Sequence, residues 1–153
     1  MIYLFALLIG IIAGLRAMTA PAVVCWAVHL GRLNLNGSWL ALLGNFWVRW
    51  PLTLLALIEL VTDQLPSTPS RTVPVQFGTR IVTGALSGAA IGAGSGTMIG
   101  GLILGIAGAV IGTLGGRAFR GWLAAVLGGD HPAAFVEDVL AIGGALLIVV
   151  ALR

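Results

Sequence analysis

Charged residues are scarce in this sequence. Only 8% of its 153 residues are Asp, Glu, Lys or Arg, whereas 59% are hydrophobic and the mean hydropathy is +1.08. Soluble proteins contain about 25% charged residues, so a composition of this kind excludes a soluble fold. We therefore expect a single integral membrane domain over residues 1–153, with the lipid bilayer as its principal partner.

Lysine is absent, and cysteine occurs once. All eight basic residues are arginines, and together with five acidic residues they give a net charge of +3. Cys25 has no second cysteine to pair with, which excludes an intrachain disulfide and a cysteine-based metal site. The sequence also contains no motif for phosphate cradling, nucleophilic catalysis or zinc binding. We expect no enzyme activity, no metal, no cofactor and no nucleic-acid partner.

Glycine, in contrast, is abundant and regularly spaced. Ile81–Gly116 contains no ionisable side chain, and many of its glycines lie four residues apart. Residues at i and i+4 share one helix face, so each series forms a groove into which another backbone can pack closely. The predicted helix-packing residues are Gly84, Gly88, Gly92, Gly96, Gly100, Gly105, Gly108 and Gly112.

The glycine-rich stretch is too long for one crossing. A single helix over its 36 residues would be about 54 Å long, nearly twice the thickness of the hydrocarbon core. We predict a glycine-zipper hairpin with its turn at Gly92–Gly96, and a separate interfacial or re-entrant helix over Arg117–Gly128. The positive-inside rule places the open end of the hairpin on the cytoplasmic side. That end carries Arg71, Arg80, Arg117 and Arg120.

The N-terminal apolar run is short. Ile2–Leu15 rises only about 21 Å, whereas a helix continued to Leu30 would rise about 43 Å, too far for a straight crossing. We predict a first span with a break near Arg16–Pro21, because proline removes a helical hydrogen bond and disfavours helix at the residue before it. Arg16 is therefore a candidate functional residue. Alternatively, it reaches the headgroups from a helix end.

The acidic residues are the other candidates. Glu59 and Asp63 lie four residues apart at the C-terminal end of a predicted helix, where their mutual repulsion and the helix dipole both oppose ionisation. They require an arginine, a bound cation or protons, unless the interface hydrates them. Glu137 and Asp138 lie near the start of the last predicted span and also require partners. Arg71 follows in a proline-rich polar segment that either binds an anionic group or is a rigid connector.

Three segments carry a family resemblance. They are Glu59-Leu-Val-Thr-Asp63, Leu65-Pro-Ser-Thr-Pro-Ser-Arg-Thr72 and Arg80-Ile-Val-Thr-Gly-Ala-Leu-Ser-Gly-Ala89. This pattern resembles a family of small bacterial integral membrane proteins classed as a domain of unknown function. The resemblance extends from Gly14-Leu-Arg-Ala17 to the final span. It implies a multi-pass protein of the bacterial inner membrane, and it assigns no catalytic residue.

These observations predict an all-α membrane protein. We expect a compact polytopic bundle with about four main spans, short broken or re-entrant helices and the glycine-zipper hairpin. Because the bundle is small, we expect it to assemble as a homo-oligomer. We also expect Arg16 or Arg117 to lie within salt-bridge reach of Glu59, Glu137 or Asp138, since unpaired charges at membrane depth are costly.

Two functions fit this prediction. The first is a transporter or channel-like protein for a small solute or ion, in which a polar cavity reaches the charged residues. The second is a non-transporting scaffold, in which the same charges are paired and closed and the glycine faces hold helices together. The candidate substrate- or ion-binding residues are Arg16, Glu59, Asp63, Arg71, Arg117, Glu137 and Asp138.

Overall fold

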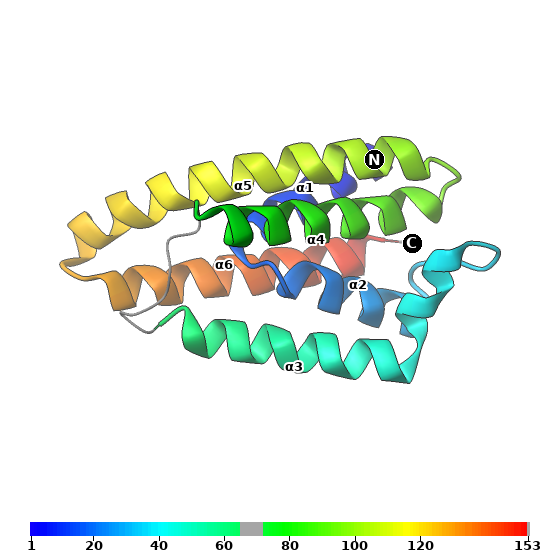
Figure 1. Cartoon of the computed structure of the whole chain (residues 1–153), viewed down its shortest axis with the longest axis horizontal. Helices are drawn as coiled ribbons and strands as arrows, with labels where there is room; N and C mark the ends of the chain where they lie inside the picture. Colours follow the sequence, from blue (N-terminus) through cyan, green and yellow to red (C-terminus); the bar gives the residue numbers. More distant parts are fainter. Residues whose placement is uncertain (65–71, 153) are drawn as a thin grey trace.

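The computed structural model of the chain describes residues 1–64 and 72–152. Over these residues the protein is all-helical, with 83% helix, seven helices and no strand. The helices are α1 (Ile2–Leu15), α2 (Thr19–His29), η1 (Trp39–Gly44), α3 (Phe46–Thr62), α4 (Pro74–Ala93), α5 (Met98–Leu127) and α6 (Asp130–Ala151). The longer helices lie side by side along the long axis of the molecule (Figure 1). The predicted all-α class is therefore confirmed.

Helices α1 and α2 form a pair that folds back on itself. The predicted break is confirmed: Arg16 ends α1 in an extended conformation (φ −139°, ψ 107°), and α2 begins at Thr19. Pro21 lies in the first turn of α2, where an intrahelical N–H partner is not needed.

The chain reverses at this break, which the sequence did not predict. A Cβ added to Gly100 would lie 2.6 Å from the ring of Tyr3 in α1, and one added to Gly94 would lie 2.6 Å from Leu33, which follows α2. Gly94 lies in the turn between α4 and α5 and Gly100 lies just after it, so the α1–α2 pair starts and ends beside that turn (Figure 1). We call this end of the molecule, which contains residues 94–97, the turn end. The segment that the sequence predicted to be one broken span therefore forms two helices that fold back on each other.

The glycine-rich stretch forms two antiparallel helices, α4 and α5, joined by residues 94–97. Its second helix is longer than predicted. Instead of a separate helix over Arg117–Gly128, α5 continues without a break to Leu127 and ends at Gly128, whose φ is +74°. The prediction of a separate helix was wrong because residues 115–117 contain no obligate helix breaker, and glycine alone costs only about 1 kcal/mol in a helix.

The glycine face of α4 contacts the backbone of α5. A Cβ on Gly84 would lie 2.8 Å from the carbonyl oxygen of Gly105, and one on Gly92 would lie 2.5 Å from that of Thr97. Gly88 lies equally close to the backbone of Gly101. No side chain fits between the two helices at these positions.

Other predicted packing glycines have different neighbours. Gly108 and Gly112 contact the backbone of α1 at Leu7 and Ile11, so α1 occupies the second glycine face of α5. Gly100 faces the side chain of Tyr3 in α1 instead of α4. Gly96 lies in the turn with a φ of +72° and nothing within 4 Å, so its prediction as a packing residue was wrong. The turn requires its positive φ.

Helix α3 begins at a side-chain cap. Its first residue is Phe46, and the side chain of Asn45 caps it by accepting a hydrogen bond of 3.1 Å from the backbone N–H of Trp47. Pro51 lies inside the helix. The cap at Asn45 fixes the start of the helix, since it satisfies a backbone donor that would otherwise have no partner.

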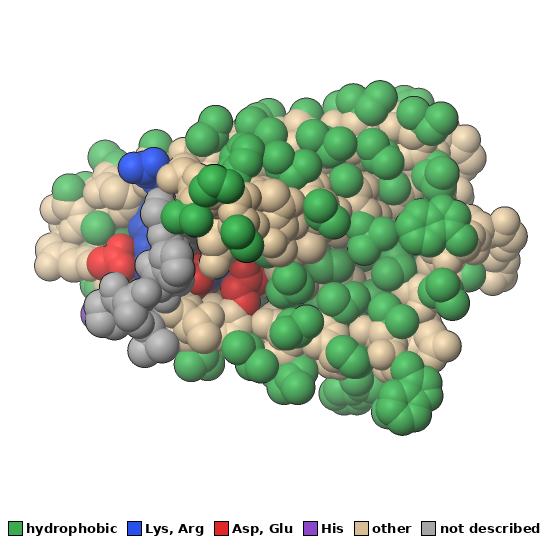
Figure 2. Space-filling view, in the orientation of Figure 1, with side chains coloured by type: hydrophobic (Ala, Val, Ile, Leu, Met, Phe, Trp, Pro, Cys, Tyr) green, Lys and Arg blue, Asp and Glu red, His purple; other side chains and the backbone are tan. Residues whose placement is uncertain are grey.

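The face of the bundle seen in Figure 2 carries many hydrophobic side chains away from the charged end. Among the described helices, α5 and α6 have the length and apolar composition to cross a membrane, and α1 and α2 are shorter apolar helices. Many large side chains are exposed, including Leu147 (71%) and Ile99 (72%). Exposed apolar surface of this extent indicates contact with lipid or with other proteins.

Candidate functional site

Charged side chains from five helices gather at the end of the bundle opposite the turn end. Figure 2 shows acidic and basic side chains together on this part of the surface. We call the group the charged cluster. It consists of Arg16, Glu59, Asp63, Arg80, Arg120, Asp130, Glu137 and Asp138.

Arg16 links three helices. Its side chain is fully buried, and it forms ion pairs with Asp63 at the end of α3 and with Asp138 in α6. Gln64 donates a hydrogen bond of 2.9 Å from Nε2 to the other carboxylate oxygen of Asp138. The ion pair with Asp138 confirms the predicted salt bridge, and the alternative in which Arg16 reaches the headgroups was wrong.

Glu59 caps the start of α2. Its two carboxylate oxygens accept hydrogen bonds from the backbone N–H groups of Ala17 (2.7 Å) and Met18 (2.8 Å). The N-terminus of a helix favours an anion, because its first N–H groups lack partners and carry partial positive charge. The Glu59 side chain is only 13% exposed, so it is held by protein groups and not by interfacial water.

Arg80 caps the end of α1. Its Nη1 atom donates hydrogen bonds to the carbonyl oxygens of Gly14 (2.7 Å) and Leu15 (2.6 Å), and its Nη2 atom lies 4.0 Å from Glu59 Oε1. The last carbonyl groups of a helix lack intrahelical partners. Two oppositely charged side chains therefore satisfy the two halves of the break between α1 and α2.

Arg80 was not among the binding residues predicted from the sequence. One signal could have identified its role. The residue lies six positions inside α4, about 9 Å along the helix axis, and an arginine at such a depth requires buried partners.

Arg120, rather than Arg117, joins the cluster from α5. Its guanidinium forms a bidentate pair with Asp130, through Nε (2.8 Å) and Nη2 (2.6 Å), and its Nη1 atom lies 3.9 Å from Glu137. Arg117 is exposed and donates a hydrogen bond of 3.2 Å to the hydroxyl of Thr72. The prediction that Arg117 belongs to a buried cluster was wrong, because three positions along a helix change the direction of a side chain by about 60°. Arg71 lies outside the described residues.

The charged cluster contains more acids than arginines. All five acidic residues of the protein belong to it, whereas its described arginines are Arg16, Arg80 and Arg120. No group of three or more His, Cys, Asp or Glu side chains able to hold a metal ion occurs among the described residues. Among the described residues, the carboxylates of the charged cluster therefore outnumber its guanidinium groups.

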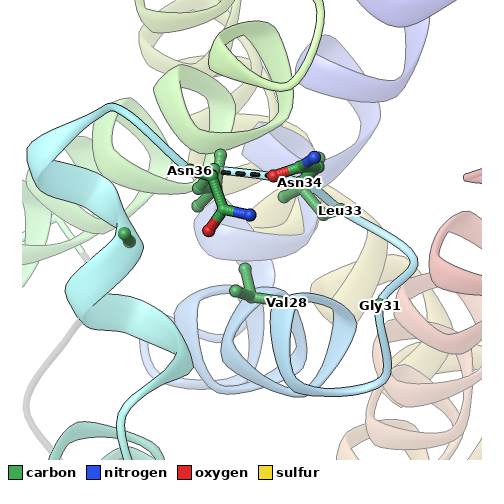
Figure 3. A pocket seen from close by; sticks show the side chains of 7 residues that line it. Val28, Gly31, Leu33, Asn34 and Asn36 are labelled. Atoms are coloured by element: carbon green, nitrogen blue, oxygen red, sulfur yellow. Dashed lines mark hydrogen bonds between the residues drawn. The ribbon is translucent and has the colours of Figure 1, made fainter.

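A pocket of about 280 Å³ lies in the loop between α2 and η1 (Figure 3). The backbone N–H of Asn36 donates a hydrogen bond of 3.0 Å to the side chain of Asn34 at its rim. The lining is apolar or amide and includes Val28 and Leu33, with no charged side chain. Since Leu33 contacts Gly94, this pocket belongs to the turn end and is separate from the charged cluster.

Comparison with protein-family models, with curated proteins and with solved structures found no match. The family resemblance of the Glu59–Asp63 and Arg80–Ala89 segments stays a prediction.

Proposed function

We propose that this protein is a small multi-pass membrane protein that transports or conducts a proton or a small cation through the charged cluster. The observation that carries the proposal is the position of Arg16. It is fully buried at the reversal between α1 and α2, and it is ion-paired with carboxylates from α3 and α6. Ionisable groups within membrane segments are rare, and they commonly mark ion or proton pathways.

In this proposal α3, α4, α5 and α6 are four spans, and α1–α2 is a re-entrant pair that enters from the turn end. The shortest span, α3, has 17 residues and is about 26 Å long, close to the hydrocarbon thickness of about 30 Å. The glycine contacts between α4 and α5 form the zipper. The positive-inside rule places the charged end, with Arg117 and Arg120, in the cytoplasm of a bacterial cell, and the bundle assembles as a homo-oligomer.

The free-energy cost of burying ion pairs supports a functional role for the charged cluster. Replacing a buried ion-pair network by well-packed apolar residues often leaves a protein equally or more stable. A gain in stability is therefore a weak explanation for a buried network that links α1, α3 and α6. Among the described residues its carboxylates outnumber its arginines, which favours a positively charged substrate. In this proposal Arg16 closes the route by pairing with Asp63 and Asp138.

The test is a flux measurement in proteoliposomes, with a pH-sensitive dye for protons and radiolabelled sodium or potassium for cations. Arg16→Gln is compared with Arg117→Gln, which makes the same substitution at an exposed arginine outside the cluster. We expect Arg117→Gln to retain the wild-type flux within about twofold. Arg16→Gln is expected to change it at least tenfold, because the ion pairs that close the route are lost.

The same flux measurement decides against the proposal in two cases. Wild-type protein that carries neither protons nor cations above empty liposomes would contradict it. Equal flux in Arg16→Gln and Arg117→Gln would also contradict it. Thermal unfolding of both variants in detergent is the control that separates a change of flux from a loss of fold.

A second candidate function is a non-transporting scaffold. It is favoured by the pairing of Arg16 with two carboxylates and by the position of the described pocket away from the cluster. In a scaffold the cluster would only hold the α1–α2 pair against α3 and α6. Variants of Arg16 would then lower the unfolding temperature, and no flux would be measured in any of them.

A further inference from the structure

Arg49 is a buried arginine without an acidic partner among the described residues. It lies in the first turns of α3 and is 7% exposed. Its Nε atom has no hydrogen-bond partner, and its Cζ atom lies 4.7 Å from the centre of the Trp26 ring. The guanidinium is thus held by an aromatic face and forms no ion pair with residues 1–64 or 72–152.

Among residues 1–64 and 72–152, no acidic side chain provides a counter-ion for Arg49. All five acidic residues of the chain belong to the charged cluster. Glu59, the nearest of them along α3, is ten residues away, which corresponds to about 15 Å along the helix. A buried guanidinium without compensating negative charge is costly. An anion from outside the chain would remove this cost.

The surroundings of Arg49 are held in place by hydrogen bonds. The indole Nε1 of Trp26 donates a hydrogen bond of 3.1 Å to the hydroxyl of Thr53, which itself donates one of 2.8 Å to the backbone carbonyl of Arg49. The ring of Trp50 packs edge-on against Trp26, with ring centres 5.8 Å apart. The aromatic face is therefore fixed relative to the helix that carries the arginine.

Two exposed tryptophans lie close to Arg49 in the sequence of α3. Trp47 is 80% exposed and Trp50 is 47% exposed, and both neighbour Arg49 in α3. Tryptophan is enriched at the level of the lipid headgroups, where its ring is partly apolar and its N–H group is polar. The phosphate groups of phospholipids lie at the same level.

We propose that Arg49 and Trp26 form a binding site for a phosphate group, supplied by the headgroup of an anionic phospholipid. The planar guanidinium offers parallel N–H donors that match two oxygens of a phosphate. The contact with the Trp26 ring fixes the orientation of the guanidinium group. The N–H groups at the edge of the guanidinium then bind the ligand. This site is at the turn end, separate from the charged cluster, and it does not depend on the proposed transport.

The test compares unfolding temperatures in an uncharged maltoside detergent, with phosphatidylglycerol, with inorganic phosphate and with neither. The proteins are wild type, Arg49→Gln and Arg32→Gln. Arg32 is an exposed arginine in the connection that follows α2, so its substitution removes the same charge without touching the site. We expect phosphatidylglycerol to raise the unfolding temperature of wild type and Arg32→Gln by several degrees, and that of Arg49→Gln by less than half as much.

The phosphate arm identifies the source of the ligand. Stabilisation by phosphatidylglycerol alone, dependent on Arg49, assigns the site to a lipid headgroup. An equal, Arg49-dependent effect of millimolar inorganic phosphate retains the phosphate site and rejects the lipid as its specific occupant. A full lipid effect in Arg49→Gln, or no effect of either ligand on wild type, overturns the proposal.

A second variant covers the case in which Arg49→Gln does not fold. Arg49→Lys keeps the positive charge but loses the planar, bidentate donors. We expect it to fold and to lose at least half of the lipid-dependent stabilisation. The full wild-type effect in Arg49→Lys would overturn the proposed site.

Discussion

Arg80 shows most directly how single side chains support this fold. It donates hydrogen bonds to two carbonyl groups at the end of α1, and its own side chain is 1% exposed. Glu59 provides the matching acceptors for the start of α2. The backbone groups freed at the break between α1 and α2 need polar partners, and here charged side chains provide them.

Replacement of Arg80 by methionine should therefore be strongly destabilising. Leu15 would lose its bond from Arg80, and the Gly14 carbonyl would keep only the hydrogen bond of 3.3 Å from the Thr113 hydroxyl. An unsatisfied buried carbonyl costs about 1–3 kcal/mol. Unfolding by denaturant in mixed micelles would measure the loss. The control is Arg117→Met at an exposed position, with an expected change within about 0.5 kcal/mol. Equal stability of the two variants would show that Arg80 does not hold the break.

Contacts with distant segments also explain how the neighbouring carboxylates of Glu59 and Asp63 are stabilised. The sequence predicted that these two carboxylates, one turn apart at a helix C-terminus, require a cation or protons. The structure provides Arg16 for Asp63, and the start of α2 for Glu59. The requirement followed from local spacing, whereas the partners come from segments more than 40 residues away.

At the scale of elements, glycine brings α1, α4 and α5 into backbone contact. Gly84 and Gly88 of α4 face α5, and Gly108 and Gly112 of α5 face α1. Gly78 lies on the same helix as Gly88, yet a Cβ there would meet nothing within 4 Å. Substitutions at Gly78 and Gly88 therefore distinguish the effect of glycine on helix packing from its effect on helix propensity.

Gly88→Ala and Gly78→Ala should have opposite effects on stability. At Gly88 the added methyl group would lie 2.8 Å from the Cα of Gly105, and overpacking of this kind costs about 1–3 kcal/mol. At Gly78 the change should be neutral or stabilising by up to about 1 kcal/mol, because alanine favours the helix. Denaturant unfolding of both variants is the measurement. The same sign and size at both sites would rule out close backbone packing at Gly88.

For the whole molecule, the main consequence of the fold is its topology. The reversal at Arg16 brings the start of α1 and the end of α2 to the turn end, beside Gly94 and Gly100. If α1 and α2 formed one broken crossing instead, the N-terminus and the loop after α2 would lie on opposite sides of the membrane.

Single cysteines in a Cys25→Ala background distinguish these topologies. We expect Asn36→Cys and Ser95→Cys to react with a membrane-impermeant maleimide from the same side as an N-terminal tag, and His131→Cys from the opposite side. All three substituted positions are exposed. Labelling of Asn36→Cys from the side opposite to the N-terminal tag would contradict the re-entrant pair, and it would restore the predicted broken span.

The sequence alone determined the features that depend on local chemistry. Apolar composition, proline and glycine predict helices, a break near Arg16 and a turn after Gly92, because each of these residues acts on the backbone beside it. The need for charge compensation at Glu59 and Asp63 is local in the same sense. These predictions required no knowledge of distant contacts.

Only the tertiary structure decided which distant groups meet. It placed Arg120 instead of Arg117 in the cluster, used Arg80 as a cap for α1, and put α1 on the second glycine face of α5. Helix rotation turns each side chain by about 100° per residue, and a small error in the packing register selects a different arginine. The direction of α2 also depends on its contacts with α3, α4 and α6, since an extended residue at the break permits several directions for the chain that follows.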